Sequence, residues 1–240
     1  MRTRKADERR PVSTPVAAHK QVSAANPRGD ETRQRLIDAA LRIFGEHGFE
    51  GASTRMIAEE AGANLAAIPY YFGGKEGLYR AAAQFIVDRA TREVIPVVNK
   101  IDEALKKGRL PRHATLGLLH ELLDRFSDFV LGSEEADDWS CFVMREQMQP
   151  GAAFEILYEG VMRRTSEACA NLLALLLRQR QDDPKIMVRA LAILGQIVVF
   201  RIAQTTALRV LGWKDFSAQR LKLIQSVVSE NLDRIAGRSR

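Results

Sequence analysis

Cysteine is scarce in this chain, with only Cys141 and Cys169 among 240 residues. So few cysteines support neither a disulfide framework nor a cysteine-ligated zinc site, and we interpret both as reduced, partly buried thiols. Long apolar runs are also missing, because the longest candidate, 190–203, is too short to span a bilayer and contains Arg201. The N-terminus is polar and basic, without the apolar core of a secretory signal. These features predict a cytoplasmic protein that does not insert into a membrane.

The motifs of common enzyme classes are missing as well. The sequence has no glycine-rich phosphate loop, no nucleophile-elbow serine and no HExxH. His113 and His120 could share a helix face, but no third ligand is near, so we interpret them as surface or pocket residues. The acidic stretch 132–138 is interpreted as a solvated loop rather than a metal site. We therefore expect no enzyme, no metal and no cofactor.

The overall charge suits a nucleic-acid partner, but its distribution weakens that argument. The net charge is +6, and the pI is near 9.5. Residues 1–30 carry +4, whereas residues 31–80 sum to −1. Any positive charge that faces DNA must therefore depend on where Arg33, Arg55 and Lys75 are placed.

The stretch 53–76, STRMIAEEAGANLAAIPYYFGGKE, predicts two short helices joined by a tight corner. The first helix is expected from about Thr54 to Ala61, capped by Ser53 or Thr54, and Gly62 is expected to be left-handed at the corner. The second helix is expected from Asn64 or Leu65 to about Phe72, with Ile68 filling the angle beside the small Ala58. This pattern is typical of a helix-turn-helix, whose second helix enters the DNA major groove. An ordinary helical hairpin in a core is the alternative.

The segment that follows, YYFGGKEGLY, favours the first interpretation. Together with the preceding helix and turn, over about Thr32 to Gln84, it resembles the TetR family of bacterial transcriptional regulators. Two further segments, FVMREQMQP and GQIVVFRIAQTTALRVLGW, are similar to the CecR-like branch of that family.

The resemblance implies which residues meet DNA. The expected contacts to base edges and phosphates come from the second helix, and Arg55 is expected to reach a base. Phosphate contacts are expected at the starts of the first and the following helix. The predicted DNA-binding residues are Thr54, Arg55, Asn64, Leu65, Ala66, Ala67, Pro69, Tyr70, Tyr71 and Lys75. Pro69 departs from the family pattern, and we expect it to distort the second helix near its middle.

The chain as a whole is predicted to be all-α. A basic tail, 1–30, is expected to be disordered; its Arg and Lys residues could reach DNA, although a plain solvated tail is the favoured interpretation. A three-helix DNA-binding domain is expected at 31–76, beginning with a helix Glu31–Gly48 whose apolar stripe contains Leu36 and Phe44. A larger helical effector-binding and dimerisation domain is expected at 77–240.

The larger domain is predicted to end in long helices. Its expected helices are Lys75–Thr91, Val97–Lys107, Thr115–Leu131, Trp139–Gln147, Ala152–Gln181, Pro184–Leu211 and Phe216–Ile235. The helix 184–211 is apolar around most of its circumference, so something must enclose it. A dimeric four-helix bundle would do so, and the resemblance implies a homodimer through 152–181 and 184–211.

The resemblance also implies a pocket for a small-molecule effector between these helices. Its adaptable Met and aromatic content would suit a lipophilic or drug-like molecule. The candidate lining residues are Phe126, Trp139, Phe142, Met144, Met148, Phe154, Tyr158 and Gln204. For each of them plain core packing is the favoured alternative. Arg145 and Arg201 lie among apolar residues and need partners, for which Glu146 or an anionic ligand could serve; we favour structural pairing.

These features predict a homodimeric repressor that binds a near-palindromic double-stranded DNA operator and is released by its effector. One alternative is a helical small-molecule carrier with an inert DNA-binding head, supported only by Pro69. A helical protein-interaction adaptor is another, and an activator or a ligand-free DNA organiser also stays open.

Overall fold

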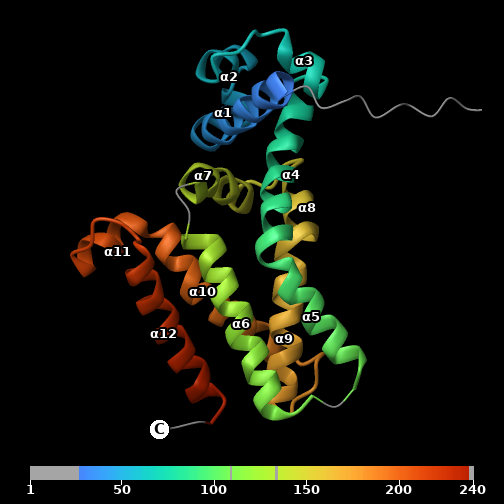
Figure 1. Cartoon of the computed structure of the whole chain (residues 1–240), viewed down its shortest axis with the longest axis vertical. Helices are drawn as coiled ribbons and strands as arrows, with labels where there is room; N and C mark the ends of the chain where they lie inside the picture. Colours follow the sequence, from blue (N-terminus) through green and yellow to red (C-terminus); the bar gives the residue numbers. More distant parts are fainter. Residues whose placement is uncertain (1–26, 109, 133–134, 238–240) are drawn as a thin grey trace, which may run out of the picture.

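The computed structural model describes residues 27–108, 110–132 and 135–237. Within these ranges every regular element is a helix (Figure 1), so the all-α prediction is confirmed. The predicted N-terminal tail lies outside the described residues except for 27–30. Those residues are helical rather than disordered, because they begin helix α1.

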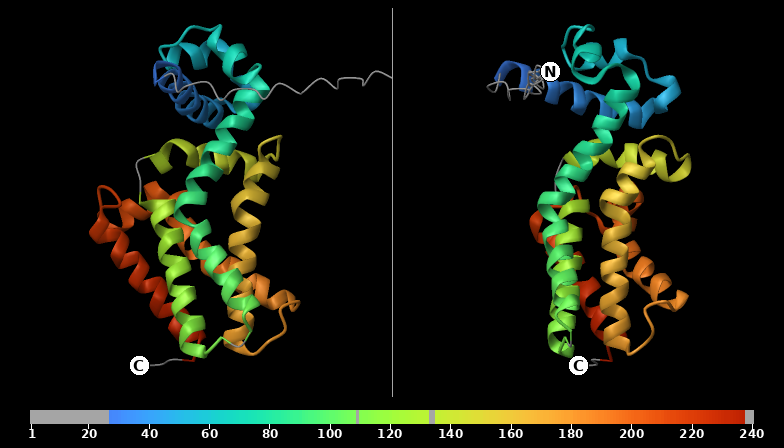
Figure 2. Two further views of the ribbon diagram at one scale, coloured as in Figure 1. Left: turned by 45° about the vertical axis from the view of Figure 1, so that its right-hand side comes forward. Right: turned by 90° about the vertical axis from the view of Figure 1, so that its right-hand side faces the viewer.

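A compact head lies at one end of the molecule (Figure 1). It contains α1 (Pro27–Gly51), α2 (Thr54–Glu60), α3 (Ala67–Phe72) and the beginning of α4 (Lys75–Glu93). The stripe predicted on α1 is buried, with Leu36 and Phe44 fully covered. Gly48 has φ +72, so the helical path is interrupted where the sequence predicts its end. Helix α4 leaves the head and continues into the body of the molecule (Figure 2).

The body is formed by the remaining helices. They are α5 (Ile95–Lys106), α6 (Arg112–Leu131), α7 (Glu135–Met148), α8 (Phe154–Leu157), the π-helical η1 (Tyr158–Met162), α9 (Arg163–Leu177), α10 (Pro184–Ile202), α11 (Gln204–Leu211) and α12 (Ala218–Ile235). Helix α7 lies between the head and the long body helices (Figures 1 and 2), and it packs against α1. It is therefore the main body element in contact with the head besides α4.

Three helix predictions need correction. The single helix expected over 152–181 is α8, η1 and α9 in succession, because a π-helical turn interrupts it at Tyr158–Met162. The single helix expected over 184–211 breaks at Ala203, and α10 and α11 meet at an angle of 83°. Helix α7 begins at Glu135, so Asp137 and Asp138 belong to a helix rather than to a solvated loop.

The exposed apolar surface of the body lies mainly on α10. Its inward face, with Ile193 and Ile197, is buried, whereas Val188, Leu191 and Val199 are half or more exposed. Helix α12 adds further exposed apolar residues, Leu223 and Val227. The apolar side chains of α9 are already covered within the chain: Leu172, Leu173 and Leu176 are buried. The expectation that 152–181 supplies half of a dimer interface is therefore not supported by its burial.

No single helix among the described residues is long and apolar enough to cross a membrane. Helices α10 and α11 reach the required length and composition only as a pair, and that pair is sharply bent.

Candidate nucleic-acid interface

The corner between α2 and α3 has the expected local structure. The Ser53 hydroxyl accepts a hydrogen bond from the backbone N–H of Met56 at 3.1 Å, which satisfies a free donor at the start of α2. Gly62 has φ +57, a conformation that costs glycine little and other residues more. Ile57, Ala58 and Ile68 are buried at the junction of the helices. The predicted cap, corner and filling residues are confirmed, and the unit has the geometry of a helix-turn-helix.

The start of α3 differs from the prediction. Asn64 does not lie in the helix; its side-chain oxygen accepts from the Ala66 backbone N–H at 2.9 Å in the approach to it. Because the helix begins at Ala67, Pro69 lies in its first turn, where a backbone N–H has no partner within the helix. The expected distortion near the middle of the helix is therefore wrong. The carbonyl of Pro69 accepts the capping hydrogen bond from Gly73 at 3.0 Å.

None of the predicted DNA-binding residues is buried. Six of them are exposed: Arg55, Asn64, Leu65, Ala66, Pro69 and Tyr70. The other four, Thr54, Ala67, Tyr71 and Lys75, are partly buried. Tyr70 is 81% exposed and meets the ring of Tyr71 edge to face. The α2–α3 surface thus presents a hydroxyl, an amide, a phenol and small apolar groups together, which are groups suited to phosphate and base-edge contacts.

The two basic side chains of this surface are already engaged within the chain. Arg55 donates a hydrogen bond to Glu59 at 2.8 Å, and this bond raises the pKa of Arg55 above its ordinary value. The ammonium of Lys75 lies 4.5 Å from the centre of the Phe49 ring. DNA phosphates would therefore compete with Glu59 for Arg55, whereas Lys75 is held on the head without an acidic partner of its own in the contacts described.

Sequence reasoning missed the residue that braces the corner. Arg35 on α1 donates to the carbonyl of Ala61 at 3.2 Å and approaches that of Gly62 at 3.5 Å. These carbonyls lie at the end of α2, where helix carbonyls have no partner within the helix and a cation is favourable. The contact spans 26 residues, so no local pattern signals it.

Helix α7 binds the base of the head through two neighbouring residues. Arg145 donates to the carbonyls of Gly45 and Glu46 on α1, at 3.1 and 2.9 Å. Glu146 accepts from the Tyr79 hydroxyl of α4, and its other oxygen accepts from the Gly151 backbone N–H at 3.1 Å. Arg145 therefore has a structural role, as favoured, but its partners are backbone carbonyls rather than Glu146.

Adjacent aspartates on α7 connect in two directions. Asp138 pairs with Arg42 of α1 at 3.4 Å, and Arg42 also contacts Glu60 of α2 at 3.1 Å. Asp137 accepts from Arg201 of α10, which also donates to the Val130 carbonyl at 2.9 Å. Burial lowers the pKa of Arg201 from its ordinary value. The favoured structural pairing of Arg201 is confirmed, and α7 joins the head to the far end of α10.

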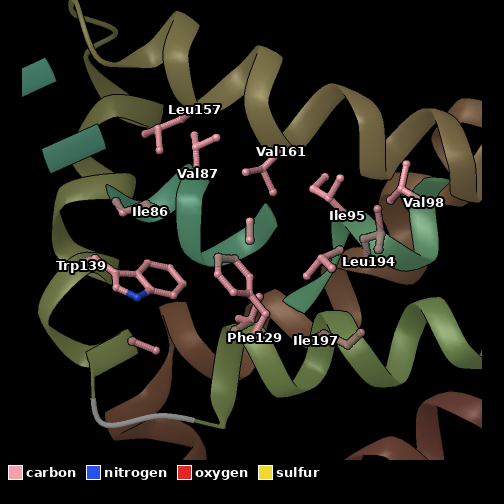
Figure 3. Packing of buried hydrophobic residues seen from close by; sticks show 14 of the residues in the cluster. Ile86, Val87, Ile95, Val98, Phe129, Trp139, Leu157, Val161, Leu194 and Ile197 are labelled. Atoms are coloured by element: carbon pink, nitrogen blue, oxygen red, sulfur yellow. The ribbon is translucent and has the colours of Figure 1, made fainter. Parts of the chain in front are cut away.

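The eight candidate effector residues do not share one pocket in this structure. Trp139 and Phe142 are buried; Phe126, Met144 and Phe154 are partly buried; Tyr158 and Met148 are exposed, Met148 by 77%. Gln204 lines a cavity of about 330 Å³ together with Asp137, Cys141 and Arg201. Trp139 stacks on Phe129 in the apolar interior between α4, α6 and η1 (Figure 3). A cavity of about 410 Å³ lies elsewhere, between the end of α1 and α7, and none of the eight residues lines it.

The geometry defines a helix-turn-helix DNA-binding head attached to a larger helical body. The description "Bacterial regulatory proteins, tetR family" matches residues 36–82, and that of the C-terminal domain of the HTH-type transcriptional dual regulator CecR matches residues 117–237. The CecR regulator of Shigella flexneri is 32% identical over 208 residues, which cover 87% of this chain and 92% of that protein. This chain belongs to the TetR family of bacterial transcriptional regulators.

Further relatives agree with this placement. The nicotine-responsive transcriptional repressor HdnoR of Paenarthrobacter nicotinovorans is 44% identical over 69 residues, or 29% of this chain and 36% of its own. The structure of AibR in complex with isovaleryl coenzyme A and operator DNA has a TM-score of 0.59, with 13% identity over 83% of this chain and 97% of that one. The latter likeness shows the fold alone. The relatives are transcriptional regulators rather than enzymes, and regulators of this family bind operator DNA and effector ligands and act as dimers.

Proposed function

We propose that this chain is a homodimeric repressor that binds a near-palindromic operator and is released by a lipophilic or drug-like effector. The observation that carries the DNA-binding part is the exposure of the α2–α3 surface on a rigid corner. Ser53, Gly62 and Arg35 fix that corner by a cap, a turn and a brace. Exposed groups held on rigid elements are what base and phosphate recognition requires.

We assign the DNA contacts to the predicted residues in two roles. Asn64, Pro69 and Tyr70 face base edges together with the apolar Leu65, Ala66 and Ala67, which suit thymine methyl groups. Thr54, Tyr71 and Lys75 contact phosphates near the starts of α2 and α4, and Arg55 reaches a base after leaving Glu59. In this assignment residues 31–76 are the DNA-binding domain, and residues 77–240 bind the effector and dimerise.

Two copies associate through the exposed face of α10 with α12. The exposed Val188, Leu191 and Val199 are spaced at helical intervals, and Gly195 between them faces open space, so a partner helix can approach closely. Exposed apolar surface of this extent is typical of an interaction site. The dimer then sets the distance between the two α3 helices, which fixes the half-site spacing of the operator.

The carrier with an inert head loses its only support. Pro69 lies in the first turn of α3, where it removes no helical hydrogen bond. The head therefore retains a helix-turn-helix in which the proline is accommodated.

A footprint on genomically selected DNA tests the proposal. Cleavage protection should show two half-sites related by a two-fold axis, centred about 34–36 Å or a multiple of that distance apart. Protection should disappear when an effector is added. A single unpaired footprint would contradict the dimeric operator, and a footprint that needs the effector would reverse the sign of regulation.

A further inference from the structure

The helix that lines α4 on the body side contains a π-helical turn at the point of contact. Helix α8 continues through η1 into α9, and the backbone N–H of Arg163 bonds to the carbonyl of Tyr158, five residues earlier. Both α8 and η1 pack against α4. Such a turn inserts one extra residue into a helix and recurs at functional sites. Here it lies against the helix that enters the head.

The closest approach is between Gly160 of η1 and Val87 of α4. A Cβ atom on Gly160 would lie 2.6 Å from both methyl carbons of Val87 and 3.2 Å from its Cβ. Val87 is buried, and a β-branched side chain in a helix is held in one χ1 rotamer, so it cannot turn aside. Anything added at Gly160 must therefore separate η1 from α4.

The interior beside this contact is apolar and contains one unsatisfied polar group. Figure 3 shows Val87, Leu157 and Val161 directed toward the same interior as Phe129 and Trp139. One helical turn after Val161, Thr165 is 1% exposed. Its hydroxyl has no hydrogen-bond partner within the described part of the chain. A buried hydroxyl without a partner is costly, so its presence points to a ligand group that completes it.

We propose that this wall is an effector site for an uncharged, mainly apolar molecule with one hydrogen-bonding group. The molecule bonds to the Thr165 hydroxyl and separates Gly160 from Val87. Because α4 continues into the head, the separation displaces the helix-turn-helix and favours a state that no longer fits the operator. This inference rests on the regulator function proposed above.

The mechanical step can be tested without a ligand, because a methyl group at Gly160 imitates it. Gly160→Ala should weaken operator binding by about tenfold, equivalent to about 1.4 kcal/mol. Adding Val87→Ala removes the opposing methyl groups and should restore wild-type affinity within about threefold. Gly117→Ala is the matched control, because a Cβ on this α6 glycine meets nothing within 4 Å. Circular dichroism and thermal unfolding check that each variant folds.

The outcomes separate this inference from the proposed function. If wild-type protein shows no preferred DNA site, the regulator function fails, and this inference fails with it. If wild type binds its operator and Gly160→Ala binds as tightly as Gly117→Ala, the inference alone is overturned. If Gly160→Ala does not fold, the double variant is compared with Val87→Ala alone, and unequal operator affinities would overturn it.

The ligand class is tested with 1-octanol against sodium octanoate, which has the same chain length but carries a carboxylate. Saturating 1-octanol should lower the operator affinity of wild type by about tenfold, whereas octanoate should leave it within about twofold. Thr165→Val keeps the shape of the side chain and removes the hydroxyl, so its response to 1-octanol should be about fivefold weaker. Equal action of octanoate, an unchanged response of Thr165→Val, or no action of 1-octanol would overturn the assigned class.

Discussion

Tyr79 on α4 donates a hydrogen bond to Glu146 on α7, and both side chains are buried. The bond joins the helix that enters the head to the helix that lies across its base, 67 residues away in sequence. Burial, and next the hydrogen bond to Glu146, raise the pKa of Tyr79 above its ordinary value. The phenol is therefore held in its protonated, donating form, and the attachment of the head depends on it.

Alkaline pH should weaken the fold through this pair. A folded-state pKa above the unfolded value contributes stability below the unfolded pKa, which is near 10 for tyrosine, and that stability is lost as pH rises toward the folded value. Urea unfolding between pH 8 and 11 should show a falling free energy of unfolding. Tyr79→Phe should remove its share of the slope and cost about 1–3 kcal/mol at neutral pH, because Glu146 loses a donor.

Burial also raises the pKa of the Cys169 thiol, to about 12. By the same sign this thiol contributes a further slope, beginning near its ordinary value of 9.0. Cys169→Ala separates the two groups, because it removes only the thiol contribution. An unchanged slope in Tyr79→Phe would show that the tyrosine does not titrate as described.

Arg35→Gln should weaken operator binding by loosening the corner between α2 and α3. The substitution removes the charged donor at the Ala61 carbonyl and should cost about 1 kcal/mol of stability. Chemical unfolding and operator titration measure the two effects. Arg180→Gln, an exposed residue paired only with Asp182 in the contacts described, is the control and should change neither. An operator affinity of Arg35→Gln equal to wild type would remove Arg35 from the recognition unit.

Pro69→Asn should keep or improve operator affinity. The proline is exposed in the first turn of α3, so its replacement disturbs no helical hydrogen bond and should change stability by about 0.5 kcal/mol or less. The asparagine adds a donor and an acceptor that can reach a base edge. Tyr70→Ala, which removes an exposed contact, should instead lose affinity. A loss of about tenfold or more for Pro69→Asn would show that the proline shapes the bound conformation.

Leu191→Glu should dissociate the dimer, because it places a charge on the exposed apolar face of α10. Light scattering at micromolar concentration should give the mass of one chain rather than two. Leu175→Glu makes the same change at the exposed large apolar residue of α9 and should leave the dimer intact. The reverse result would return the interface to the helix pair expected from sequence.

Local chemistry made the helix-turn-helix predictable from the sequence. A cap such as Ser53, a corner glycine such as Gly62 and small or apolar residues such as Ile68 act within a few positions of one another. The kink at Gly48 follows the same logic. Which of the predicted DNA-binding residues touch DNA stays a prediction, although their exposure agrees with the assignment.

Long-range contacts and two breaks in the body helices were not predictable. Arg35, Arg145 and Glu146 find partners in distant segments, and no periodicity encodes those distances. The sharp bend at Ala203 has no proline or glycine at the break, and it coincides with the Arg201 contacts to α6 and α7. The π-helical turn at Tyr158–Met162 accompanies the close approach of Gly160 to Val87, which only the folded chain shows.

Specific operator binding is measured most directly by fluorescence anisotropy. Wild-type protein would be titrated into DNA from upstream of its own gene and into scrambled DNA, each at two salt concentrations. A repressor should bind the upstream DNA tightly, resist competition by scrambled DNA and lose affinity as salt rises. Weak and equal binding to both, followed by no preferred site in a selection from genomic fragments, would contradict the regulator and favour the small-molecule carrier.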